Sequence, residues 1–480
     1  MRPRTSLPVL VLGALTLTGA LRAQPITPET VPDPKIPGFR FPESEATLTR
    51  WITELARGTA AETRTAAAAN LTRHGWGLWT ALTATTTQFS DGQPLFVFET
   101  WLTPDDLLAQ AATAAPADLP VPLRLADRRR SPLRPISQFD RRLTDDDTVE
   151  APTPETQIDR IAGFTKFDPT AAAHISAQRL LDLATLDTLL TGGAQQVTPF
   201  PVTALAAKPV FQIVRARDLV AGRYYALKAW SGPPATPQPD PPSQWPGAVW
   251  IDLLGGGRGA GALEAPFGDD GSARTDDTPY PLAALLPYRL SAADAAAFNA
   301  AKPGTDAAGG DYALLVAMHV AGRELARWTW QTFWWTPTPD EPGAPSSAPV
   351  AALRPPQLRG AARHYAMALA YTMLSPNEPY VGGDNTAPAV YVYNPYLEAR
   401  FAPADLPDSQ PGLDPAGRPA ANNVGVQTNC LSCHIQANYH PLRLATAPRF
   451  TGARYIDLGA AAFVGTLQTD FLWALPRHAR

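Results

Sequence analysis

Apolar residues recur every three to four positions through several stretches of the first 200 residues. This period is typical of helices that bury one face. We expect helices in residues 44–58, 61–86, 103–110 and 168–190. Ser44 and Thr59 stand where hydroxyl side chains commonly cap helix N-termini. Together with a short alternating strand at 94–101, the pattern predicts a mainly helical region over residues 24–200.

After about residue 200 the pattern changes to short segments rich in aromatic and β-branched residues, separated by turns. These segments are 210–216, 224–230, 247–254, 312–320 and 327–335. They are typical of antiparallel strands, so we expect an antiparallel sheet or sandwich over residues 201–345. The glycine-rich run at 255–261 has no helix after it, which favours a flexible turn over a dinucleotide-binding loop.

Residues 346–480 are expected to form a third region, built of helix and loops. Helical spacing returns at 357–374 and predicts a long helix there. A loop-rich stretch leads from that helix to the only two cysteines of the chain. The three regions together predict an α+β fold.

The N-terminus has the order of a secretory signal peptide: two early arginines, an apolar stretch at 7–17, and small residues for cleavage after Ala20 or Ala23. We therefore assign residues 1–23 to a signal peptide, with a retained anchor as the alternative. No later segment is apolar for long enough to span a membrane, so we expect a soluble protein in the periplasm or otherwise exported. The net charge of -4 becomes more negative after cleavage and argues against a nucleic-acid partner.

Both cysteines lie in the sequence Cys430-Leu-Ser-Cys433-His434. Cys-x-x-Cys-His is the attachment signature of c-type haem. On one helical turn the two thiols can reach the two vinyl groups of a porphyrin, and the next residue presents its imidazole to the iron. The motif therefore predicts one covalent haem c at Cys430 and Cys433, with His434 as the proximal ligand.

Two other interpretations of the cysteine pair stay open. The pair could form a disulfide, or a redox-active dithiol, but no βαβ pattern surrounds it. It could also hold zinc together with His440 and another ligand, but two thiols would need distant help. Haem attachment is favoured because this arrangement rarely arises by chance and because c-type haem is attached outside the cytoplasm, which fits an exported chain.

No methionine follows His434, so a protein-derived distal haem ligand is expected from upstream. The candidates are Met318, His319, His364, Met367 and Met373. We rank His319 first, because strand alternation separates it from the apolar face of Met318. Met367 comes second and His364 third, on one face of the helix expected at 357–374. His440 lies too close to His434 in sequence to reach the opposite haem face.

Several segments resemble a family of large, mostly uncharacterised bacterial cytochrome c family proteins. They are "HGWGLWTALT", "FVFETWLTPDDL", "YALKAW", "YALLVAMHVAGRELARWTWQTFWW", "NPYLEARF" and "NCLSCHIQA". The resemblance implies a covalent haem at Cys430, Cys433 and His434, and it draws attention to His319. The chain departs from the family where "TFEH" is expected, because Trp334 and Trp335 stand in place of the polar pair.

These observations favour an exported monohaem c-type cytochrome that carries electrons between redox partner proteins. The alternative is a haem-dependent peroxidase or oxidoreductase, or a haem sensor, with an open or displaceable sixth ligand. No Ser-His-Asp order, paired-carboxylate pattern or phosphate loop stands out. The aromatic segment 327–335 could line a ligand site or an electron path, but a pair of buried strands explains it more simply.

Overall fold

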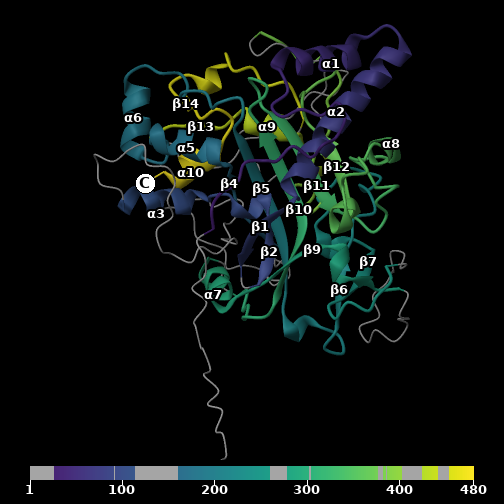
Figure 1. Cartoon of the computed structure of the whole chain (residues 1–480). Helices are drawn as coiled ribbons and strands as arrows, with labels where there is room; N and C mark the ends of the chain where they lie inside the picture. Colours follow the sequence, from purple (N-terminus) through teal and green to yellow (C-terminus); the bar gives the residue numbers. More distant parts are fainter. Residues whose placement is uncertain are drawn as a thin grey trace, which may run out of the picture.

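The structure is a computed structural model, and it combines helices with mainly antiparallel sheets, as the sequence predicts for an α+β fold (Figure 1). It describes residues 26–90, 92–113, 161–259, 278–301, 304–376, 382–384, 386–402, 424–441 and 453–479. The expected signal peptide lies outside the described residues.

The predicted N-terminal helices form, with small differences at their ends. They are α1 (Glu45–Arg57), α2 (Ala61–Leu82) and α3 (Pro104–Thr113). Ser44 caps α1, since its side chain accepts a hydrogen bond from the Thr47 backbone N–H at 3.1 Å. Thr59 does not cap α2, because the chain enters that helix one residue later, at Ala60, which has no side-chain acceptor.

The helical segment expected at 168–190 is two helices, α5 (Pro169–Ala177) and α6 (Leu183–Thr191). The interruption falls at Arg179, whose φ of 53° no α-helix allows. Each helix has its own aspartate cap, Asp168 for α5 and Asp182 for α6.

The largest sheet among the described residues has seven strands, and every pair in it is antiparallel. Its path is β12 (Tyr365–Leu369), β11 (Thr329–Trp335), β10 (Tyr312–Gly322), β5 (Leu205–Val214) and β3 (Ile161–Gly163). Two further strands, β4 (Lys166–Phe167) and β9 (Leu286–Arg289), pair with β5 and β10. This sheet takes strands from all three of the expected regions.

Smaller sheets and short helices complete the described fold. Their strands are β1 (Thr85–Ser90), β2 (Gln93–Phe96), β6 (Tyr224–Lys228), β7 (Ala248–Asp252), β8 (Tyr280–Pro281), β13 (Asn438–Tyr439) and β14 (Leu467–Gln468). Their helices are α7 (Ala292–Ala301), α8 (Ala348–Ala352), α9 (Cys430–His434) and α10 (Ala474–His478). The β7–β8 pair is parallel, which the expected antiparallel pattern did not include.

The long helix predicted at 357–374 is wrong. The chain forms a short 3-10 turn at Gly360–His364 and then continues as the edge strand β12. Four of the five residues of β12 are buried, because the strand pairs with β11 along its full length. Tertiary pairing therefore overrides the helical preference of the alanines and leucine in this segment.

The two faces of the large sheet are covered by different parts of the chain. On one face Phe333 stacks on Trp79 of α2 with ring centroids 4.4 Å apart, and α2 crosses these strands in Figure 1. Neighbouring strand residues point to opposite faces, so Thr332 faces away from α2. There Asn394, from the C-terminal part of the chain, donates to Thr332 Oγ1 at 2.7 Å. The C-terminal region therefore covers the face opposite α2.

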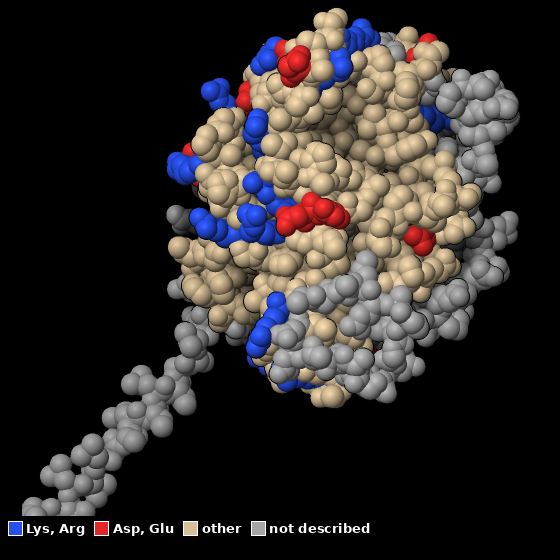
Figure 2. Space-filling model, turned by 90° about the vertical axis from the view of Figure 1, so that its right-hand side faces the viewer, with Lys and Arg blue, Asp and Glu red and all other residues tan. Residues whose placement is uncertain are grey.

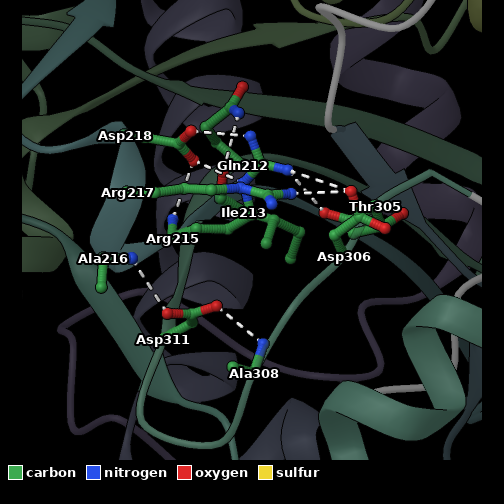
Figure 3. Close-up of polar contacts among 10 residues, drawn as sticks. All are labelled: Gln212, Ile213, Arg215, Ala216, Arg217, Asp218, Thr305, Asp306, Ala308 and Asp311. Atoms are coloured by element: carbon green, nitrogen blue, oxygen red, sulfur yellow. Dashed lines mark hydrogen bonds and ion pairs between the residues drawn. The ribbon is translucent and has the colours of Figure 1, made fainter.

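A polar cluster fixes the end of β5 against the loop that leads into β10 (Figure 3). The guanidinium of Arg215 donates to both carboxylate oxygens of Asp218, at 2.9 and 2.7 Å, and to the Thr305 carbonyl at 3.0 Å. Asp311 accepts the backbone N–H of Ala216 at 3.0 Å. The side chain of Arg215 is 9% exposed, so these bonds are largely screened from water.

The surface view in Figure 2 shows a wide area without charged side chains beside a band of Lys and Arg that also includes a few acidic residues. In the part of the chain that the structure describes, no helix combines the length and apolar character needed to cross a membrane.

Candidate haem-attachment site

The cysteine motif forms a helix of its own, α9, which is little more than one turn long. Asn429 begins it: the side-chain oxygen accepts from the backbone N–H groups of Leu431 and Ser432 at 2.9 and 3.2 Å. The side-chain nitrogen of Asn429 donates to the carbonyls of Thr372 and Val390 at 3.1 and 2.6 Å. This fully buried residue therefore both starts the helix and anchors it to a distant segment.

His434 lies at the end of α9 with a defined ring orientation. Its Nδ1 is 2.9 Å from the carbonyl oxygen of Phe471, and the ring packs on Trp330 with centroids 4.0 Å apart. A carbonyl can only accept, so Nδ1 carries the hydrogen and Nε2 keeps its lone pair. Burial lowers the pKa of His434 to about 3, which keeps the imidazole neutral. This is the tautomer that a metal-binding histidine needs.

The two thiols lie on the same turn of helix and are not joined by a disulfide. Burial raises the pKa of Cys433 to about 12, and the charge of Glu398 adds to the effect. The pKa of Cys430 is raised by the same two causes and by Cys433 itself. Redox-active and zinc-binding cysteines have lowered thiol pKa values. The surroundings of this pair therefore fit neutral thiols better than reactive thiolates.

His319 lies on the sheet face opposite α2 and meets a carboxylate from the C-terminal region. Its Nε2 is 3.0 Å from Oε1 of Glu398, and Oε2 of Glu398 accepts the Asn394 backbone N–H at 2.7 Å. Burial alone would raise the pKa of Glu398, but the charge and hydrogen bond of His319 and the Asn394 N–H hold it below its ordinary value. Lys208 is the direct cross-strand neighbour of His319.

The His319–Glu398 pair and α9 share one electrostatic environment. The charge of His319 lowers the pKa of His434, and the charge of Glu398 raises the pKa of both thiols. The backbone brings these groups together through a close approach at Gly425, where a Cβ would overlap the carbonyl oxygen of Glu398. The structure thus places the first-ranked distal candidate near the motif.

The second- and third-ranked distal candidates lie elsewhere. Met367 is opposite Phe333 on β11 and so faces α2, where its sulfur would lie 2.7 Å from a Cβ on Gly75. His364 packs with Trp335 at a centroid distance of 6.3 Å. Trp335 is five residues along β11 from Trp330, about 17 Å away at strand rise. The structure brings neither Met367 nor His364 to His434.

Met318 and Met373 are the remaining distal candidates. Met318 pairs with Phe333 across the sheet and is buried on the α2 face. Met373 is also buried, one residue beyond Thr372, whose carbonyl binds Asn429. Among the described residues, no three His, Cys, Asp or Glu side chains gather closely enough to hold a metal ion by themselves. The zinc alternative with His440 therefore has no ligand set there.

Sequence reasoning did not single out Glu398 or Asn394 as site residues. They lie in "NPYLEARF", one of the segments that carry the family resemblance. Trp334 and Trp335, where the chain departs from the family pattern, point to opposite faces of β11. Trp335 faces away from the site and donates to the Ala284 carbonyl at 3.0 Å, while Trp334 shares the face of Thr332.

Comparisons with protein-family models, with curated proteins and with solved structures gave no match to this chain. Two neutral thiols on one turn, followed by an imidazole whose Nε2 is available, fit covalent haem attachment. A haem brings four nitrogen ligands of its own and needs only one or two more from the protein.

Proposed function

We propose that the chain is an exported monohaem c-type cytochrome that carries electrons. Its haem c is bound covalently through Cys430 and Cys433, with His434 as the proximal ligand. The observation that carries this proposal is the fixed tautomer of His434, whose Nδ1–H is held by the Phe471 carbonyl. The arrangement supports a ligand role because a second hydrogen-bond partner orients nearly every metal-binding histidine.

When bound, the haem supplies one-electron redox chemistry. The chain's own residues hold and shield the site. Trp330 packs on the His434 ring, and Trp473 donates from its indole nitrogen to the Cys433 carbonyl at 3.1 Å. These contacts limit rotation of the ring and of the helix end. Buried surroundings also restrict water, which is one of the factors that set a haem potential.

His319 is the proposed distal ligand. It lies on the sheet face that the C-terminal region covers, opposite Thr332 on β11, and Trp330 of the same strand packs on the His434 ring. Ligation through Nε2 would require this nitrogen to leave Glu398, because the two atoms are 3.0 Å apart. The same proposal includes export of the chain, electron exchange with redox partner proteins, and kinship with the family that the sequence resembles.

The His319–Glu398 contact also supports a second candidate function. A histidine whose Nε2 stays on a carboxylate suits a proton-transferring pair beside an open iron position. In that case the protein is a haem-dependent peroxidase or oxidoreductase, or a haem sensor. The two candidates differ in whether His319 occupies the sixth position.

Optical spectroscopy of the purified protein with a redox titration separates the two. Electron carriage predicts a six-coordinate low-spin spectrum, reversible one-electron reduction and slow binding of cyanide. His319→Ala should then convert the spectrum to high spin, whereas Met367→Ala, on the opposite face, should leave it unchanged. A wild-type ferric protein that is already high spin and binds cyanide quickly would contradict electron carriage and favour the second candidate.

A further inference from the structure

A buried polar chain lies on the α2 side of the large sheet, away from the His319 face. The hydroxyl of Tyr371 is 2.8 Å from Nδ1 of His74 on α2. Nε2 of His74 is 3.0 Å from Oε1 of Glu324, which follows β10. The side-chain nitrogen of Gln331 donates to the Tyr371 oxygen at 2.6 Å. Four segments of the chain therefore meet in one hydrogen-bonded chain.

With a neutral His74, the donors and acceptors of this chain fit one proton arrangement. The carboxylate of Glu324 accepts, so the hydrogen of His74 is on Nε2. Nδ1 of His74 is then the acceptor for the Tyr371 hydroxyl, while Gln331 supplies the hydrogen bond to the phenol oxygen. Tyr371 thus has an imidazole base in direct contact with its proton, and that base has a carboxylate behind it.

The chain is closed off from water. His74 is 3% exposed, Glu324 1% and Tyr371 6%. The phenol ring lies in an apolar cluster formed by Leu48, Ile52, Leu71 and Leu325. Burial raises the pKa of Tyr371 well above its usual range, so the phenol stays protonated at rest. A buried phenol of this kind exchanges its proton with a fixed partner rather than with solvent.

Other buried tyrosines have different partners. Tyr365 donates to the Leu315 carbonyl at 2.6 Å, and a carbonyl does not take up a proton. Tyr288 donates to the carboxylate of Asp294 at 2.9 Å. A carboxylate is a weaker base than an imidazole by about 2 to 3 pKa units. The surroundings of Tyr371 are therefore the better suited to accept a phenol proton.

We propose that Tyr371 is a redox-active tyrosine whose oxidation is coupled to proton transfer to His74. One electron leaves the phenol for a strong one-electron oxidant, such as a high-potential metal complex or a peroxide-oxidised haem, which is reduced by one electron. The O–H bond of Tyr371 breaks and an N–H bond forms at Nδ1 of His74. The products are a neutral tyrosyl radical and an imidazolium that faces Glu324. Return of one electron reverses both transfers.

A short path of bonds also links Tyr371 to the cysteine motif. The carbonyl of the next residue, Thr372, accepts from the side chain of Asn429, which directly precedes Cys430. One hydrogen bond and a few covalent bonds therefore join the tyrosine to the motif. Use of this route by a haem rests on the proposed function, but the redox activity of Tyr371 itself does not.

The test uses the full-length purified protein and a photogenerated oxidant, tris(bipyridine)ruthenium with persulfate. After illumination and freezing, electron paramagnetic resonance should show a tyrosyl radical. The signal should be lost in Tyr371→Phe and kept in the matched control Tyr365→Phe. In His74→Gln the radical yield should fall, because the proton acceptor is gone. The same samples can be stained for covalent haem, so failure of the haem proposal is scored separately.

Labelling guards against a variant that fails to fold. In wild-type protein with nitrogen-15 in its histidine rings, the radical should show hyperfine coupling to one imidazole nitrogen. A signal of equal yield in folded Tyr371→Phe, or a wild-type radical without that coupling, would overturn the proposal.

Discussion

Asn429→Ala is expected to destabilise the protein far more than the loss of an ordinary helix cap. The side chain makes four hydrogen bonds in a fully buried position, two within α9 and two to the carbonyls of Thr372 and Val390. Alanine removes all of them at once and leaves buried donors and acceptors without partners.

The expected size follows from these contacts. Loss of a helix N-cap costs about 1 kcal/mol. Each of the two lost bonds to buried carbonyls adds about 1 kcal/mol. The free energy of unfolding should therefore fall by about 3 kcal/mol. Asn429→Ser should cost about 2 kcal/mol. A serine hydroxyl can still cap the helix, but it does not replace the two bonds to the carbonyls.

Guanidinium chloride unfolding, followed by tryptophan fluorescence, measures these differences between samples of equal haem content. Ser44→Ala is the matched control, because Ser44 caps α1 in an exposed position with a single backbone bond of 3.1 Å. It should cost about 1 kcal/mol or less. Equal losses for Asn429→Ala and Ser44→Ala would refute the view that Asn429 anchors α9 to the segment around Thr372.

Three further predictions concern the rest of the fold. Arg215→Met should lower the free energy of unfolding by about 3 kcal/mol, because it removes the guanidinium from the largely buried carboxylate of Asp218. Arg217→Met should change it by about 0.5 kcal/mol or less, since that ion pair is exposed, and equal effects would contradict this. Gly425→Ala should cost more than about 3 kcal/mol, because its Cβ overlaps a backbone carbonyl. In Gly163→Ala the new Cβ meets nothing closer than 3.4 Å, so this substitution should cost about 1 kcal/mol at most. Thermal unfolding measures both changes. Burial raises the pKa of Glu99 to about 7, so its stabilising contribution is present below pH 4.5 and lost as the pH rises through 7. Relative to Glu99→Gln, the wild type should lose stability over that range, and parallel pH profiles would disprove it.

Local patterns in the sequence predicted the helices and strands whose apolar residues recur with a regular period. The period of apolar residues located α1, α2 and α3, and β-branched and aromatic segments located β5, β10 and β11. The failure at 357–374 has a physical cause. Its run of alanine, methionine and leucine suits a helix in isolation, and only pairing with β11 makes it a strand. That pairing also turns Met367 toward α2.

The candidate site shows the same division. Cys430, Cys433 and His434 could be proposed as a site from the sequence alone, because the motif depends only on spacing within five residues. The partners of His434 and His319 could not. Phe471 lies 37 residues from His434, and Glu398 lies 79 residues from His319. Contacts over such separations are set by the folded topology and leave no local signal in the sequence.

Mass spectrometry of the tryptic peptide that contains Cys430 and Cys433 tests the central claim most directly. The protein should be purified from an exported fraction of cells able to attach c-type haem and digested after denaturation. We predict that this peptide carries the mass of one haem and absorbs visible light, and that neither thiol reacts with iodoacetamide. A haem-free peptide from the same cells, with both thiols alkylated or joined in a disulfide, would contradict the account.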